Sequence, residues 1–210
     1  MNYNPDFFIP KDIEDAKSII LTKEGSTTEI RWEMETKWTV DLLSNITDIN
    51  SESVVLDWGC GIGRLSKALI NKFGCRVAGV DLQPKMIEYA INYVNDDRFI
   101  AINYEDAIRQ MPSSFFTHAI SVWVLQHSNK IQYEIPLLSN SLLDSGALFV
   151  LENISKAIPN ETSFYDDGIP TKEILNKYFK FDSYGKIPLK YTTKAVHDNS
   201  WWALLSKNKD

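Results

Sequence analysis

The stretch that decides the fold of this 210-residue chain runs from Val54 to Ser66 and reads VVLDWGCGIGRLS. It predicts a buried strand, then a glycine-rich turn, then the first turn of a helix. Glycine permits positive φ and carries no Cβ, so a ligand can lie directly against such a turn. Asp57 ends the strand, and its carboxylate is therefore expected at the edge where open α/β sheets bind their ligands.

A second acid strengthens this interpretation. Asp81 ends the next apolar run, residues 76–80, and stands twenty positions after Gly61. Folds of this kind place at about that separation the carboxylate that holds a ribose. The alternative is a tight strand-to-helix turn that binds nothing. The agreement between the glycines and both acids disfavours that alternative.

The spacing of the glycines indicates which nucleoside is held. A dinucleotide fingerprint reads Gly-x-Gly-x-x-Gly and holds pyrophosphate at the helix N-terminus. Here the glycines are Gly59, Gly61 and Gly63, and Arg64 stands at the third position of the fingerprint. The Gly-Lys-Ser/Thr of a phosphate-binding loop does not follow either. The turn suits a ligand with a cationic end and no phosphate.

The segment VLDWGCGIG, residues 55–63, closely resembles the first motif of the class I S-adenosylmethionine-dependent methyltransferases. The resemblance covers roughly residues 50–155 and is loose outside them. It implies a Rossmann-like α/β fold, with a doubly wound, mostly parallel sheet of seven strands, helices on both faces and an antiparallel last strand. It also implies S-adenosylmethionine as cofactor and S-adenosylhomocysteine as product.

The hydrophobic pattern predicts the elements of such a sheet. The expected strands are 53–57, 76–80, 98–102, 117–122, 146–151, 181–184 and 200–206, and the expected helices are 28–46, 63–73, 84–94, 130–143 and 170–179. The last two strands are expected to pair antiparallel at the sheet edge. We expect a single domain over residues 1–210: a lid and helix (1–48, irregular to about residue 25), a cofactor-binding core (50–155), a substrate loop (153–169), and a C-terminal helix with edge strands (170–210).

Composition limits the partners. The net charge of −6 argues against a general nucleic-acid binder, and no apolar run approaches the length of a membrane span. The start of the chain lacks the pattern of a signal peptide, and the only cysteines are Cys60 and Cys75, which favours a reducing cytoplasm. The three histidines show no metal-ligand spacing, so no metal is expected. We expect a cytoplasmic monomer or homodimer with a small-molecule acceptor, and neither nucleic acid nor membrane as partner.

The segment after the third expected strand contains Glu105, Asp106 and Ala107. In the family, an acid here accepts the adenine amino hydrogen while the next backbone amide reaches the ring. Asp106 and Ala107 match those positions, and Glu105 lies beside them. The alternative is that Asp106 caps a helix, as a short acidic side chain does well.

The fourth expected strand leads into Ser121–His127, which resembles the family's Ser-x-x-x-Leu-x-His stretch. The Asn-Pro-Pro-Tyr or Asp-Pro-Pro-Tyr of exocyclic-amine DNA methyltransferases is missing at this point. His127 is the candidate catalytic residue, because an imidazole titrates near neutral pH and is able to take a proton from a hydroxyl. The alternative is a scaffold histidine that holds the loop or packs on the cofactor.

Three further side chains are candidates for cofactor contact. The aromatic faces of Trp58 and Trp123 attract a sulfonium, although tryptophan here also suits the core. Arg31 is able to pair with the cofactor carboxylate, or else is a solvated helix charge. The predicted cofactor-binding set is Arg31, Asp57, Trp58, Gly59, Cys60, Gly61, Gly63, Arg64, Asp81, Leu82, Glu105, Asp106, Ala107 and Trp123.

The resemblance implies transfer of a methyl group to an oxygen, or to a nitrogen, of a small molecule. A sugar or surface-glycan precursor is one acceptor class that the resemblance suggests. One alternative is a non-catalytic, methyltransferase-like partner protein. The other is a nicotinamide-dependent oxidoreductase, which Arg64 in place of the third glycine disfavours.

Overall fold

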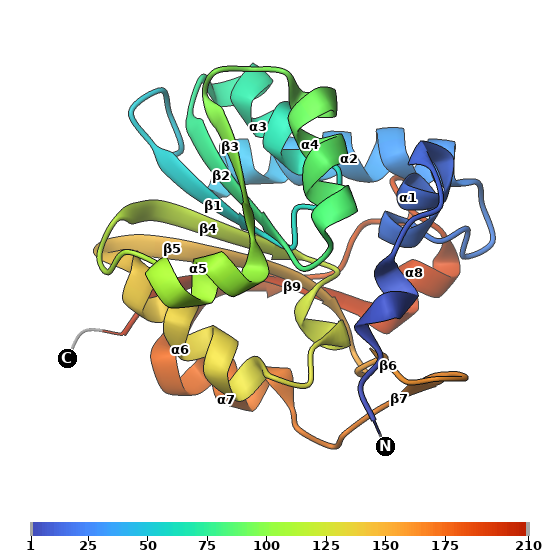
Figure 1. Cartoon of the computed structure of the whole chain (residues 1–210). Coiled ribbons are helices and arrows are strands. Elements are labelled where there is room, and N and C mark those ends of the chain that lie inside the picture. The colour runs from blue at the N-terminus through green and yellow to red at the C-terminus, as the bar shows by residue number, and fades with distance from the viewer. Residues whose placement is uncertain (1, 209–210) are drawn as a thin grey trace.

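Seven strands form one sheet in the order β3-β2-β1-β4-β5-β9-β8, in a computed structural model that describes residues 2–208 (Figure 1). The strands are β1 (Val54–Trp58), β2 (Arg76–Asp81), β3 (Phe99–Asn103), β4 (Phe116–Val122), β5 (Leu142–Asn153), β8 (Phe179–Gly185) and β9 (Ser200–Lys207). Strands β1 to β5 are parallel, and β9 runs antiparallel to both β5 and β8. The expected doubly wound α/β fold is confirmed, with β8 as the edge strand.

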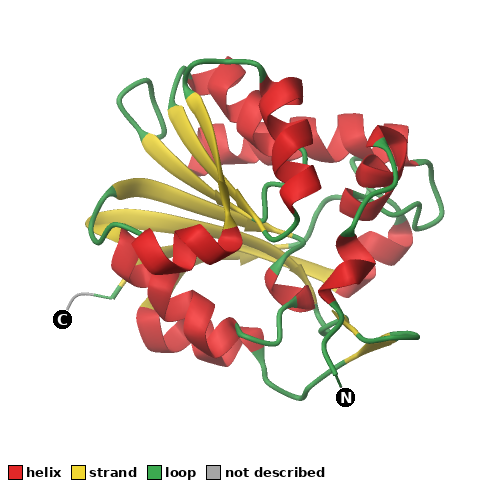
Figure 2. Cartoon of the chain, viewed as in Figure 1, coloured by secondary structure: helices red, strands yellow, loops and turns green. Residues whose placement is uncertain are grey.

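Helices cover both faces of the sheet (Figure 2). One face packs against α2 (Thr28–Ile46), α3 (Arg64–Phe73), α4 (Pro84–Val94) and the short α8 (Lys194–Asn199). The other packs against α5 (Tyr104–Gln110), α6 (Ile131–Ser141) and α7 (Thr171–Tyr178). No helix within residues 2–208 has the length and apolarity that a membrane crossing needs.

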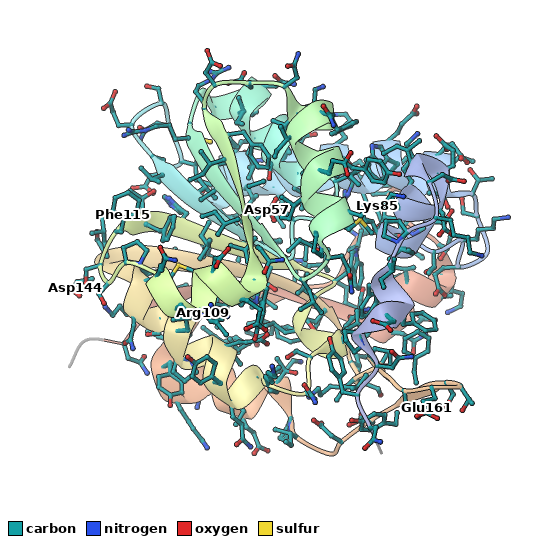
Figure 3. All side chains as sticks on the ribbon, viewed as in Figure 1. Asp57, Lys85, Arg109, Phe115, Asp144 and Glu161 are labelled. Carbon is teal, nitrogen blue, oxygen red and sulfur yellow. The ribbon has the colours of Figure 1, made fainter. Side chains whose placement is uncertain are left out.

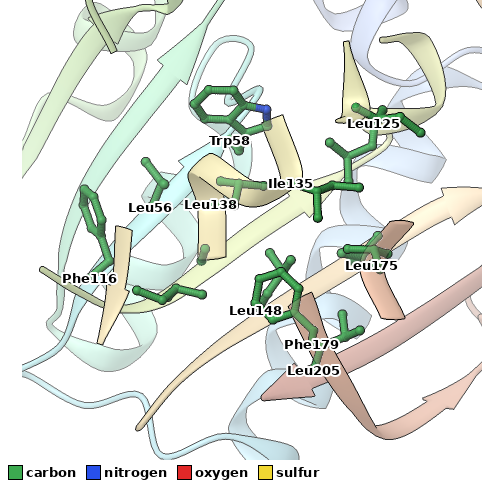
Figure 4. Close-up of a cluster of buried hydrophobic side chains, with 14 of the residues drawn as sticks. Leu56, Trp58, Phe116, Leu125, Ile135, Leu138, Leu148, Leu175, Phe179 and Leu205 are labelled. Carbon is green, nitrogen blue, oxygen red and sulfur yellow. The ribbon is translucent and has the colours of Figure 1, made fainter. Parts of the chain in front are cut away.

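The core beneath α6 and α7 shows how strand alternation orients β1 (Figure 4). Leu56 and Trp58 point into this cluster and pack with Leu138 of α6 and Leu175 of α7. Successive side chains of a strand point to opposite faces, so Asp57 lies on the other face, toward α3. Asp57 is buried, whereas Arg109, Asp144 and Glu161, labelled with it in Figure 3, are exposed.

The N-terminal segment is more regular than expected. It contains a 3-10 helix, η1 (Pro5–Phe8), and the helix α1 (Ile13–Ile20). The long loop after β5 also contains structure, because β6 (Ile158–Pro159) pairs with β7 (Phe164–Tyr165) in a small hairpin. Neither these elements nor α5 and α8 were predicted. One or two turns of helix, or two residues of strand, are too short to show a period.

The N-terminal segment and the loop after β5 meet at the carboxyl edge of the parallel strands. The backbone N–H of Asn4 donates to the carbonyl of Pro159 at 3.0 Å, and the Phe7 and Phe164 rings lie 4.6 Å apart between centroids. Gln83, at the start of α4, donates from its amide to the Pro5 carbonyl at 2.6 Å. The N-terminal segment therefore crosses this edge as a cover.

Candidate active site

A cavity of about 620 Å³ lies beneath that cover, at the carboxyl ends of β1, β2 and β4. Its position between β1 and β4 is the switch point at which doubly wound sheets bind ligands. The predicted site residues that line the cavity are Arg31, Trp58, Gly59, Gly61, Asp81, Leu82, Trp123 and His127. Among residues 2–208, no group of three or more His, Cys, Asp or Glu side chains is arranged to hold a metal ion.

The glycine turn and Asp81 hold one another in place. Gly59 and Cys60 both donate from their backbone N–H groups to the carbonyl of Val80 at 2.8 Å. Asp81 Oδ2 accepts from the N–H of Gly61 at 2.8 Å, and Oδ1 accepts from Gln83 at 3.0 Å. Burial raises the pKa of Asp81 against the effect of these bonds. Each carboxylate oxygen keeps a lone pair, so Asp81 is able to accept a ligand hydroxyl as well.

Asp57 lies behind the turn rather than in the cavity. It is buried, and Ser66 donates from Oγ to its Oδ2 at 2.6 Å. Burial raises the pKa of Asp57 to about 6. The carboxylate therefore joins β1 to the first turn of α3 and lies outside the cavity lining.

Cys60, Gly63 and Arg64 also lie outside the cavity lining. Arg64 is buried, donates from Nη1 to Thr36 at 2.8 Å and lies over the ring of Trp32, 5.7 Å from its centroid. Arg64 packs α3 against α2, whereas Gly63 lies against Val94 of α4 and Cys60 lies against Gly79 of β2. They support the shape of the loop instead of facing a ligand.

The segment after β3 differs most from expectation. Helix α5 begins at Tyr104, with Asn103 as its N-cap, so Asp106 is not the cap. Glu105 and Asp106 are exposed on its first turn, and Ala107 is buried in the core. The cavity is lined by Tyr104 in their place.

Arg31 is a buried charge and not a solvated one. It is 4 % exposed and forms a two-pronged ion pair with Glu35, at 2.7 Å from Nε and 3.1 Å from Nη2. Its Nη1 donates to the carbonyl of Thr22 at 2.6 Å. A cofactor carboxylate would therefore share this guanidinium with Glu35.

Trp123 has an unusual backbone at the end of β4. Its φ of 61° falls in the left-handed region, which a bulky residue rarely adopts. Its N–H still donates to Leu151 at 2.7 Å, and the Arg31 guanidinium lies 5.9 Å from the ring centroid. Backbone outliers of this kind cluster at ligand sites.

His127 lies in the turn η2 (Leu125–His127), with both ring nitrogens engaged. Its Nδ1 lies 2.6 Å from the carbonyl oxygen of Ala157, and its Nε2 lies 3.0 Å from the amide nitrogen of Gln126. Burial lowers the pKa of His127. Phe8 and Phe164 flank the ring, with centroids 5.3 and 6.0 Å away. A neutral imidazole held by two bonds fits a scaffold better than a free base.

Comparisons with known proteins agree with this geometry. Residues 55–137 match the family model described as "Methyltransferase domain". This segment is a methyltransferase domain.

One curated relative is the malonyl-[acyl-carrier protein] O-methyltransferase of Acetivibrio thermocellus, 30% identical over 112 residues. The match spans 50% of this chain and 38% of the relative. This chain therefore spans well under half the length of that relative.

Two solved structures share the fold of the methyltransferase domain. A protein of Pyrococcus horikoshii OT3 aligns with a TM-score of 0.65 and 18% identity over 89% of this chain and 94% of its own. Geranyl diphosphate C-methyltransferase from Streptomyces coelicolor A3(2), in complex with Mg²⁺, geranyl diphosphate and S-adenosyl-L-homocysteine, aligns with a TM-score of 0.66 and 12% identity. That alignment covers 82% of this chain and 80% of the other.

The cavity fits S-adenosylmethionine, the cofactor that the sequence resemblance implies, on chemical grounds. Asp81 supplies acceptor capacity for a ribose diol, and the rings of Trp58 and Tyr104, 5.5 Å apart between centroids, supply flat apolar walls. Gly61 faces the cavity at φ +54, and a Cβ there would lie 2.6 Å from Ile20 Cδ1. The glycine is therefore required first by the packing of α1.

The cavity residues that sequence reasoning missed include Tyr3, Tyr104 and Glu134. Glu134 is a buried carboxylate on α6, only 5% exposed. A lone Glu in a helical pattern is usually solvated, so the sequence carries no local signal for its burial.

Proposed function

We propose that this protein transfers the methyl group of S-adenosylmethionine to an oxygen or nitrogen of a small molecule held in the same cavity. The observation that carries the proposal is that the cavity joins Asp81 and the glycine turn to the end of β4. It then extends past the predicted cofactor residues to Asn153 and Lys156. Its volume of about 620 Å³ lies within the usual range of small-molecule sites.

Positioning accounts for the reaction without a dedicated base. Methyl transfer is an in-line displacement at the sulfonium, and alignment of two reactants contributes as much as ~7–11 kcal/mol in favourable cases. The chain's part is to hold the acceptor and to exclude water. Phe8 from η1 and Phe164 from β7 both pack against His127 and line the cavity. Their apolar rings support the exclusion of water.

Oxygen is the first choice of acceptor atom and nitrogen the second. The name of the Acetivibrio thermocellus relative, an O-methyltransferase, supports oxygen. The polar end of the cavity supports a polar acceptor, because the buried Lys156 lines it and pairs with Asp167 at 2.7 Å. A sugar or glycan precursor belongs in a substrate panel, although none of the compared proteins supports that class.

The remaining parts of the proposal are a single domain, a reducing compartment and a monomer or homodimer. One continuous seven-stranded sheet supports the single domain. Both cysteines, Cys60 and Cys75, are free and buried, which supports a reducing compartment such as the cytoplasm.

Calorimetry and a turnover assay test the function. We expect S-adenosylmethionine and S-adenosylhomocysteine to bind and NAD not to bind, and we expect a panel of hydroxyl and amine acceptors to yield S-adenosylhomocysteine. Binding of NAD without either sulfur nucleoside would overturn the proposal. Binding of the cofactor with no turnover on any acceptor would favour the non-catalytic partner protein.

A further inference from the structure

Glu134 carries an unsatisfied oxygen inside the cavity. Only 5% of the residue is exposed, and it belongs to the cavity lining. Within residues 2–208, neither its Oε2 nor the hydroxyl of Tyr104 makes a hydrogen bond of good geometry, although Tyr104 and Ser128 both lie beside the carboxyl group. A buried carboxylate oxygen without a donor is costly. Such an atom indicates a place for a ligand N–H or O–H.

The surroundings locate this oxygen relative to Asp81. Tyr104 follows β3 directly, and its pKa is raised by burial and by the neighbouring Glu134 carboxylate. The pKa of Tyr3 is raised to about 12 by burial, and next by Glu134 and Asp81. Tyr3, Asp81 and Glu134 all line the same cavity. The rings of Trp58 and Tyr104 form its wall.

We propose that Glu134 accepts a hydrogen bond from the 6-amino group of the cofactor's adenine. This inference rests on the proposed function. With the ribose on Asp81, the base extends along the carboxyl edge of the sheet toward Tyr104, where a flat apolar wall and a free acceptor meet. Burial raises the pKa of Glu134. A carboxyl group keeps an acceptor oxygen whether it is ionised or protonated, and the adenine amino group donates, so the two match. Asp106, exposed on the first turn of α5, does not reach this cavity.

The same chemistry could come from an amine on the methyl acceptor, and the experiment separates the two sources. Calorimetry compares S-adenosylhomocysteine with S-inosylhomocysteine, in which a carbonyl replaces the amino group. The proteins are the parent chain, Glu134→Gln and, as a matched control, the exposed Asp106→Asn. We expect the parent to prefer the adenosyl ligand by about 10- to 100-fold, as a hydrogen bond to a charged group implies.

Glu134→Gln presents an amide N–H that is able to donate to the inosine carbonyl. We expect the preference to fall by about 10-fold or more in this variant and to stay unchanged in Asp106→Asn. Equal melting temperatures of parent and variant establish that the fold is kept. Should Glu134→Gln fail to fold, the parent protein still tests the inference. Equal affinity of the parent for S-adenosylhomocysteine and S-inosylhomocysteine would overturn it.

Three outcomes stand against the inference in different ways. If Glu134→Gln keeps the preference for S-adenosylhomocysteine but raises the KM for an amine acceptor, then Glu134 binds the acceptor's amine. That result overturns the adenine contact. If the preference for S-adenosylhomocysteine is lost in Asp106→Asn instead, then Asp106 makes the contact with the adenine amino group. A parent that binds neither nucleoside fails the proposed function itself, which distinguishes that failure from failure at Glu134.

Discussion

Gln126 and His127 form a side-chain pair that fixes the state of the imidazole. The Gln126 backbone carbonyl accepts from Ala157 N–H at 2.8 Å, and its side-chain Oε1 accepts from Asn153 N–H. Its amide NH₂ is therefore the group that faces His127 Nε2, at 3.0 Å. His127 Nε2 must then be an acceptor, and Nδ1–H donates to the Ala157 carbonyl. The tautomer follows from the network around it.

The first prediction follows from that pair. His127→Ala removes two part-buried hydrogen bonds, each contributing roughly 0.5–1.5 kcal/mol. We expect a lower melting temperature and weaker cofactor binding, with a loss in kcat below about 10-fold. The pH–rate profile should keep its shape. His127→Asn, which retains a donor near Nδ1, should recover part of the stability.

The opposite outcome would restore the catalytic role. If His127→Ala depresses kcat by ~10²–10⁴ with cofactor affinity nearly unchanged, and removes a near-neutral limb from the pH–rate profile, the imidazole acts as general base. Rates measured between pH 5 and 9 for parent and variant decide between the two.

A second prediction concerns Asp81. Asp81→Ala removes the acceptor for the Gly61 N–H and for a ribose diol, so we expect the Kd for S-adenosylhomocysteine to rise by roughly 10- to 100-fold. Asp81→Asn should fall between the parent and the alanine variant. Asp144→Ala, at a side chain 93% exposed, serves as control and should bind as the parent does. Unchanged affinity in Asp81→Ala would remove this residue from the site.

A third prediction separates two reasons for the glycine at position 61. Gly61→Ala adds a Cβ that would lie 2.6 Å from Ile20 Cδ1, so it should displace α1 and speed tryptic cleavage after Lys17. Cofactor binding should weaken with it. The double variant Gly61→Ala/Ile20→Ala has room for the methyl group and should recover much of both properties, with Ile20→Ala alone as control. If the double variant binds the cofactor as poorly as Gly61→Ala does, the added Cβ blocks the ligand directly and does not act through Ile20.

The fourth prediction is a pH dependence of folding that arises from Glu152. This residue is 1% exposed, and burial raises its pKa from 4.5 to about 8, although the Leu125 N–H donates to Oε1 at 2.9 Å. A raised carboxyl pKa means that the folded state prefers the protonated form. Its stabilising contribution is full below about pH 4.5 and is lost as pH rises through about 8.

Urea unfolding at pH 6 and pH 9 measures this effect. The parent should lose roughly 3 kcal/mol more than Glu152→Gln over that interval, because the glutamine keeps an acceptor for Leu125 and does not titrate. Equal losses in both proteins would show that folding does not raise the pKa of Glu152.

The elements that sequence reasoning predicted best are those with a local signal. The helices Thr28–Ile46 and Pro84–Val94 have the expected bounds, the second because proline suits the first turn of a helix. The antiparallel final pair was also expected. Strand β5 proved longer than expected, from Leu142 to Asn153, because its pairing with β4 and β9 extends it beyond the apolar run.

The sequence by itself determined that a glycine turn and two strand-end acids, Asp57 and Asp81, meet at one edge of a parallel sheet. Only the tertiary structure decided which acids face the cavity. Side chains turn by about 100° per residue along a helix, so the start of α5 at Tyr104 directs Asp106 outward. Packing of α6 on the sheet brings Glu134 inward across thirty residues of chain. Such long-range placement depends on how whole elements pack and leaves no local pattern.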